Sequence, residues 1–146
     1  MLALIAQNNL TLATGHIGPE ESLLILREAR NLGVQRIVVT HPLGRAIAMS
    51  IPQMQEAARL GAFLEIVTYQ RTTSNNPPIT TEEHVKAIRA IGPEHIILSS
   101  DTGHGGNPLH PDALATLFHT LREQGFTEAE IDRMAKKNPA TVLGLP

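Results

Sequence analysis

The sequence predicts an α/β domain in which parallel β-strands alternate with helices. One pattern recurs three times: a helix end, a glycine, an aliphatic strand and a polar residue, with the strands at 37–39, 64–67 and 96–98. Each strand is a continuous apolar run, which is typical of a parallel sheet buried on both faces. The chain has 146 residues, the size of one domain, so we expect residues 1–146 to fold as a single unit.

The elements follow one another in a regular order. A strand at 10–14 comes first, and Pro19 followed by two glutamates predicts the start of the next helix. Three later helix starts carry N-capping residues: Ser50, Thr80 and Thr127. The C-terminal part differs, because two helices in succession are expected near 111–124 and 128–136, before a short closing segment at 138–145.

Composition and charge exclude several classes of protein. Twelve Lys and Arg against fourteen Asp and Glu give a net charge of −2, which argues against nucleic acid as a partner. The absence of cysteine excludes disulfides and Cys-ligated zinc. No apolar run approaches the ~20 residues that span a membrane, and the N-terminus lacks the features of a signal peptide. We therefore expect a cytoplasmic protein that makes no contact with membranes.

Polar side chains gather at the predicted strand ends, where parallel α/β folds place their chemistry. The first strand leads into His16, the second into His41 and the fourth into Asp101. Neutral imidazole and carboxylate are ligands of zinc and similar ions, so these three residues predict a site for one divalent metal ion. The plainer alternative is that each histidine hydrogen-bonds its own loop and that the aspartate caps the next helix.

Two further residues are candidates for contact with a substrate. Tyr69 ends the third strand, and His104 lies in the glycine-containing loop after Asp101. That loop matches neither the dinucleotide fingerprint nor the P-loop, so a phosphate site at 103–107 is the weaker interpretation. The histidines at 84, 95 and 119 are expected to have solvated or capping roles.

Several segments resemble the second half of the amidohydrolase superfamily, whose members are metal-dependent hydrolases with a (β/α)₈ barrel. The matching segments end strands 5, 6 and 8 of that barrel and close the chain: Ala13-Thr-Gly-His16, Val38-Val-Thr-His41-Pro, Ile97-Leu-Ser-Ser-Asp101 and Asn138-Pro-Ala-Thr-Val-Leu-Gly-Leu145. The strand at 64–67, which ends at Tyr69, takes the place of strand 7. The resemblance covers nearly the whole chain.

The resemblance implies half of a TIM-like barrel with two extra C-terminal helices. It implies that His16, His41 and Asp101 bind a divalent metal, zinc or else manganese, and that Asp101 is the catalytic base. The substrate would be a small molecule with an amide- or ester-like bond, near Tyr69 and His104. The family's His-x-His pair on strand 1 and its Lys or Glu on strand 4 have no counterpart here. The chain alone is therefore expected to hold an incomplete site.

Four strands of an eight-stranded barrel leave two unpaired edges. Two copies of the chain can associate as a homo-oligomer, another polypeptide can supply an N-terminal half, or the chain can be a fragment of a longer enzyme. A different functional interpretation also stays open: a non-catalytic α/β module that retains the fold without a working metal site.

Overall fold

Four parallel strands form one open sheet in a computed structural model that describes residues 1–45, 47–68, 78–103 and 105–145. The strands lie side by side in chain order: β1 (Thr11–Ala13), β2 (Arg36–Val39), β3 (Phe63–Val67) and β4 (Ile96–Ser99). The α/β class and the four strand positions expected from the sequence are thereby confirmed. The order is that of one half of a parallel barrel.

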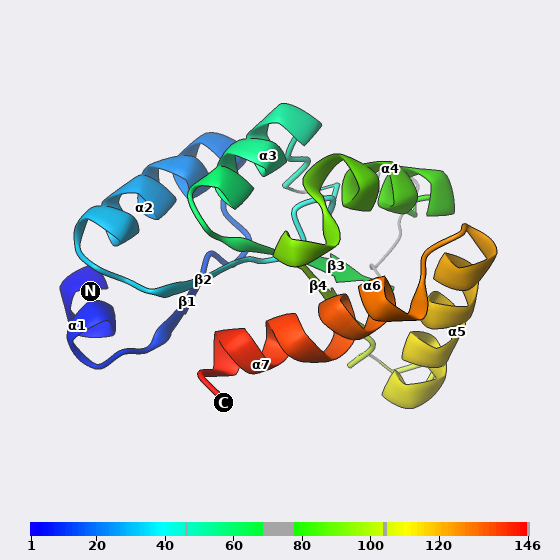
Figure 1. Cartoon of the computed structure of the whole chain (residues 1–146). Helices are drawn as coiled ribbons and strands as arrows, with labels where there is room; N and C mark the ends of the chain where they lie inside the picture. The colour runs from blue at the N-terminus through cyan, green and yellow to red at the C-terminus, as the bar shows by residue number, and fades with distance from the viewer. Residues whose placement is uncertain (46, 69–77, 104, 146) are drawn as a thin grey trace.

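Helices alternate with these strands and lie on both sides of the sheet. In chain order they are α1 (Leu2–Gln7), α2 (Pro19–Asn31), α3 (Ile51–Arg59), α4 (Thr81–Ile91), the 3₁₀ turn η1 (Pro93–His95), α5 (His110–Glu123), α6 (Glu128–Asp132), the π-helical turn η2 (Arg133–Lys137) and α7 (Asn138–Leu143). Figure 1 shows α2, α3 and α4 arrayed along one side of the sheet, with α7 on the opposite side.

The helix starts follow the signals in the sequence. Ser50, Thr80 and Thr127 each cap a helix within a complete capping box. The C-terminal part is the exception, because the closing segment expected at 138–145 begins with helix α7. Helical structure runs on from α6 through η2 into α7, and Pro139 falls in the first turn of α7.

The main core lies between the sheet and the layer formed by α2, α3 and α4. Alternate strand residues face this layer and are buried: Leu12, Ile37, Val39, Leu64, Ile66, Ile96 and Leu98. Leu26, Met54 and Ile88 meet them from the three helices and are at most 1% exposed. This interface supplies most of the buried apolar surface that stabilises the domain.

The second face of the sheet is only half covered, which differs from the burial on both faces that the apolar runs predict. Val38, Phe63 and Glu65 alternate with the core residues and are half-buried. Glu65 lies on β3, which pairs with a strand on each side, so its polarity marks this open face and not a sheet edge.

Helix α7 covers the amino-terminal end of the second face through buried polar contacts. The Asn138 side-chain amide donates hydrogen bonds to the carbonyls of Pro93 (2.7 Å) and Ile96 (2.6 Å), and the residue is 3% exposed. The Thr11 hydroxyl donates to the carbonyl of Val142 at 2.6 Å, which joins the first strand to the last helix.

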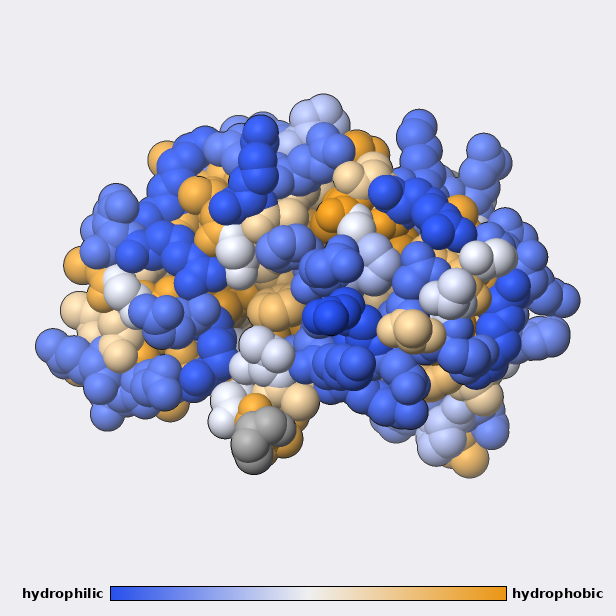
Figure 2. Space-filling model, in the orientation of Figure 1, coloured by the Kyte–Doolittle hydropathy of each residue, from blue (hydrophilic) through white to orange (hydrophobic). Residues whose placement is uncertain are grey.

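The face of the molecule seen in Figure 2 carries hydrophilic side chains over most of its area, with smaller hydrophobic patches between them. Among the described residues, the helices are too short or too polar to cross a lipid bilayer.

Replacing Asn138 by alanine tests how much α7 stabilises the sheet. Asn138→Ala leaves two carbonyl groups without their donor, so we expect the free energy of unfolding to fall by about 2 kcal/mol or more. Urea denaturation measures this loss. Thr141→Ala, on the exposed side of the same helix, is the control and should change stability by less than ~0.5 kcal/mol. Equal stability of the two variants would contradict the assigned role of Asn138.

An ion pair makes stability depend on pH. Arg45 donates two hydrogen bonds of 2.8 Å to the Glu83 carboxylate, and these, with the bond from the Thr80 amide, lower the pKa of Glu83 to about 2. A carboxyl group with a pKa depressed by folding stabilises the fold above its unfolded pKa, and this contribution is lost as the pH falls toward the folded value. The contribution is modest because both side chains are partly exposed.

We expect Glu83→Gln to lose less stability than the wild type between about pH 5 and pH 2, because glutamine can still close the capping box but carries no charge. Denaturation midpoints measured across this range provide the test, with Glu82→Gln, at an exposed neighbour, as the matched control. The same pH dependence in Glu83→Gln and the wild type would refute the contribution of this pair.

Candidate functional site

Two threonines fix the carboxyl ends of β1 and β2 to each other. The Gly15 amide donates to the Thr40 hydroxyl at 3.1 Å, and the Thr40 amide donates to the Thr14 hydroxyl at 3.1 Å. These two bonds continue the pairing of the strands after the sheet hydrogen bonds end. The loops that carry the next residues, His16 and His41, are therefore held in register with each other.

His16 and His41 meet at this edge of the sheet. Their Nε2 atoms are 2.8 Å apart, and their ring centroids are 4.7 Å apart with the ring planes 41° from parallel. At this distance one Nε2 donates a hydrogen bond to the lone pair of the other. His16 is exposed, whereas His41 is half-buried.

The backbone and ring of His41 are both unusual. Its φ of +20° is a conformation that non-glycine residues seldom adopt. Its Nδ1 is buried and has no hydrogen-bond partner among the described residues. Strained backbone and unpaired buried polar atoms are concentrated at functional sites, where the rest of the fold supports them.

Asp101 follows β4 in a left-handed turn whose two flanking residues both contact a histidine. Its φ is +53°, and its side chain is exposed. The hydroxyls of the flanking residues, Ser100 and Thr102, are buried and lie 2.7 Å and 2.8 Å from Nδ1 of His110. One imidazole nitrogen thus serves both neighbours of Asp101 and fixes the turn on which the carboxylate stands.

The structure brings together two of the three expected metal ligands. In the part of the chain that is described, no three His, Asp or Glu side chains lie close enough to hold one ion, so Asp101 stands apart from the histidine pair. Tyr69 and His104, the two expected substrate contacts, lie outside the described residues.

The histidine pair fits a metal ion in part. Two imidazole nitrogens that bind one tetrahedral zinc at ~2.05 Å lie ~3.3 Å apart, so the rings need to open by about 0.5 Å from their present 2.8 Å. A ligating histidine usually donates its second ring N–H to an acceptor, which Nδ1 of His41 lacks among the described residues. The Nε2 atoms of His16 and His41 are both suitable metal ligands, but among the described residues the Asp101 carboxylate does not join them.

The clamp formed by Ser100, Thr102 and His110 was not expected from the sequence. The one sequence feature that could have indicated this clamp is the pair of small hydroxyl residues on either side of Asp101. Their meeting with His110 depends on how α5 packs, and no local pattern encodes that.

Comparison with known proteins identifies a shared fold. A model of a family of unknown function (DUF6282) matches residues 1–65, which include His16 and His41 but not Asp101. The chain is similar to the crystal structure of an amidohydrolase from Burkholderia multivorans with bound HEPES, with a TM-score of 0.68 and 15% sequence identity. That match covers 99% of this chain and 56% of the amidohydrolase, so the chain spans about half of its length. No curated protein matches the sequence.

Replacing His110 tests the clamp. His110→Ala leaves the buried hydroxyls of Ser100 and Thr102 without their shared partner, so we expect a loss of about 1 kcal/mol in stability and faster amide hydrogen exchange at residues 100–102. His119→Ala, on the exposed face of the same helix, is the matched control. Unchanged exchange around Asp101 in His110→Ala would show that the turn does not depend on the imidazole.

The likeness to an amidohydrolase establishes the fold that this turn belongs to, one half of a parallel α/β barrel.

Proposed function

We propose that the chain carries part of the active centre of a metal-dependent hydrolase of the amidohydrolase type. The observation that carries the proposal is the approach of two imidazole Nε2 atoms to 2.8 Å at the carboxyl edge of a parallel sheet. The similarity in fold to half of an amidohydrolase supports it, as does the resemblance of the segments that end at His16, His41 and Asp101.

In this proposal His16 and His41 hold a divalent ion, zinc or else manganese, through their Nε2 atoms. Such an ion supplies positive charge that polarises a substrate carbonyl and acidifies water. Asp101 is the base that accepts the proton of the attacking water, and it also serves as a ligand. Tyr69 and His104 contact a small substrate with an amide- or ester-like bond.

The position of Asp101 suits the role of a base. Its side chain is exposed at the same sheet edge as the histidines, and its backbone is held in a left-handed turn. The His110 contacts hold the flanking hydroxyls of Ser100 and Thr102, and the Asp101 carboxylate stays exposed. A carboxylate on a fixed backbone has less freedom to lose when it takes up a proton or a ligand.

We propose that a further polypeptide segment completes this centre. The second sheet face is half-exposed at Val38, Phe63 and Glu65, and among the described strands β1 and β4 each pair on one side alone. A barrel closed by a second copy of the chain, or by another four-stranded segment, covers this face and satisfies both edges. It also supplies the additional ligands that an ion held by two histidines requires.

A specific observation favours a second candidate, a non-catalytic α/β module. The 2.8 Å contact already satisfies the Nε2 atoms of His16 and His41 as a hydrogen bond. No third His, Asp or Glu joins them within the described ranges. On this view the fold is retained without a working metal site.

Metal content per chain and mass in solution, measured together on the purified protein, test the proposal. We expect about one zinc or manganese per closed site, lost in His16→Ala and in His41→Ala but retained in His119→Ala, whose imidazole is exposed on α5. Metal bound to an assembly larger than one chain supports completion by a second copy. A well-folded protein that takes up no metal, alone or assembled, would favour the non-catalytic module.

A further inference from the structure

One carboxylate interrupts the apolar strands. Among the described strand residues, Glu65 on β3 is the one acidic side chain, and it lies on the second face of the sheet. Its neighbours on that face are apolar: Phe63 and Val67 along β3, and Ile97, with which it is in register on β4. Glu65 itself is half-buried. A charged side chain therefore lies among hydrophobic ones on a strand that is paired on both sides.

Glu65 has no partner within the described part of the chain, where no hydrogen bond or ion pair engages its carboxylate. Arg36 is the one cation on the described strands, and it shares this face with Glu65 because it alternates with the buried Ile37. Its guanidinium instead binds the Asn9 carbonyl and the Thr11 hydroxyl. The Glu65 carboxylate therefore depends on solvent, which reaches it only while this face is open.

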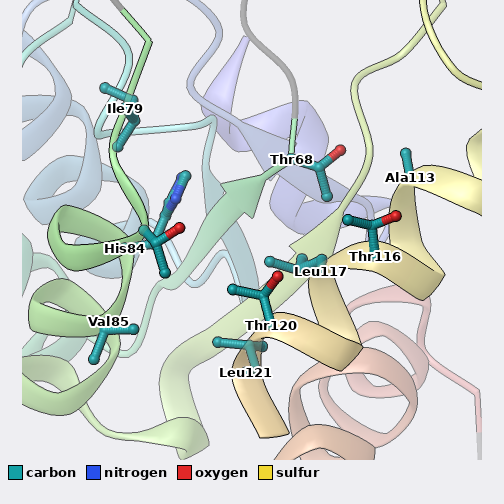
Figure 3. A pocket seen from close by; sticks show the side chains of 10 residues that line it. Thr68, Ile79, His84, Val85, Ala113, Thr116, Leu117, Thr120 and Leu121 are labelled. Carbon is teal, nitrogen blue, oxygen red and sulfur yellow. The ribbon is translucent and has the colours of Figure 1, made fainter. Parts of the chain in front are cut away.

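The opposite face of β3 is already closed by helices. Figure 3 shows His84 and Val85 of α4 across from Thr116 and Thr120 of α5, with Thr68, which follows β3, between them. The cavity that remains there is about 160 Å³, close to the ~150 Å³ that holds one benzene molecule, so no helix or strand of a partner fits into it. The face that still lacks a layer is the one that carries Glu65.

Any layer that covers this face removes the solvent from Glu65. A carboxylate that is buried without a positive partner is strongly destabilising, whereas one that meets a lysine or arginine keeps a favourable interaction. The second face is therefore selective: its apolar residues favour a covering layer, and Glu65 requires that this layer bring a positive charge.

A second copy of the chain does not meet this requirement. Each interior layer of an eight-stranded parallel barrel takes its side chains from alternate strands. If two copies close one barrel, β3 is its third strand and the β3 of the partner copy is its seventh, so both Glu65 carboxylates fall in the same layer. Because such an interior is just wide enough for side chains to fill it, the two negative charges would lie close together.

We propose that the second face takes a non-identical four-stranded segment that presents a lysine or arginine opposite Glu65, and that Glu65 prevents the chain from pairing with its own copy. This inference rests on the completion of the barrel in the proposed function, and not on its metal chemistry. The positive side chain neutralises Glu65, while Phe63, Val67 and Ile97 pack against the apolar residues around it.

The Glu65→Lys variant of this chain serves as a probe, because it is a half-barrel that carries the required cation. ¹⁵N-labelled wild type is mixed with unlabelled Glu65→Lys, and native mass spectrometry measures the two homodimers and the mixed dimer. We expect the mixed dimer to be tighter than either homodimer by about tenfold or more, because opposite charges meet in it alone. Glu28→Lys, which makes the same change in net charge at an exposed position on α2, is the matched control and should show no such preference.

A wild-type homodimer as tight as the mixed dimer, the absence of a mixed dimer, or the same preference with Glu28→Lys would each overturn the proposal. If Glu65→Lys does not fold, Glu65→Leu takes its place: without the charge, it should self-associate about tenfold more tightly than the wild type, and unchanged association would refute the proposal. All dimers are measured without added metal. Failure of the wild type to take up metal therefore counts against the hydrolase alone, whereas absence of the charge preference counts against this inference alone.

Discussion

The parallel alignment of the four strands is the constraint on which the rest of the structure depends. Because every strand runs the same way, each carboxyl end reaches the same edge of the sheet, however far apart the residues lie in the chain. That single fact puts His16 beside His41 and places Asp101 on the same edge. The parallel alignment also separates the candidate site from the contacts that stabilise the fold. The amino-terminal edge of the sheet packs against α7 through Asn138 and Thr11.

The two sides of the sheet differ in how completely they are buried. The side under α2, α3 and α4 is a closed core with a small cavity at one corner, where His84 is shielded from water. The other side is half-open and carries Glu65 among apolar neighbours. In the proposed function, the strand-end histidines lie beside this half-open side and still need partners from another segment.

Local signals were enough to predict most of the fold. The aliphatic strands and the caps at Ser50, Thr80 and Thr127 depend on near neighbours in the chain, so the sequence reveals them directly. The strand-end positions of His16 and His41 follow from the same repeat. The clamp of His110 could not be predicted, because it depends on where α5 packs. The half-open second face was also missed, since an apolar run looks the same whether or not a second layer covers it.

The bond between Thr11 and Val142 joins residues that are 131 positions apart. During synthesis, β1 emerges well before the acceptor of its hydroxyl, which is made 131 residues later. Contacts of such long range slow folding, because the chain must close a large loop before they form. On the ribosome β1 therefore lacks this contact until Val142 has been made. In that interval the strand is open to pairing with other chains, because an unpaired strand edge is a template for association.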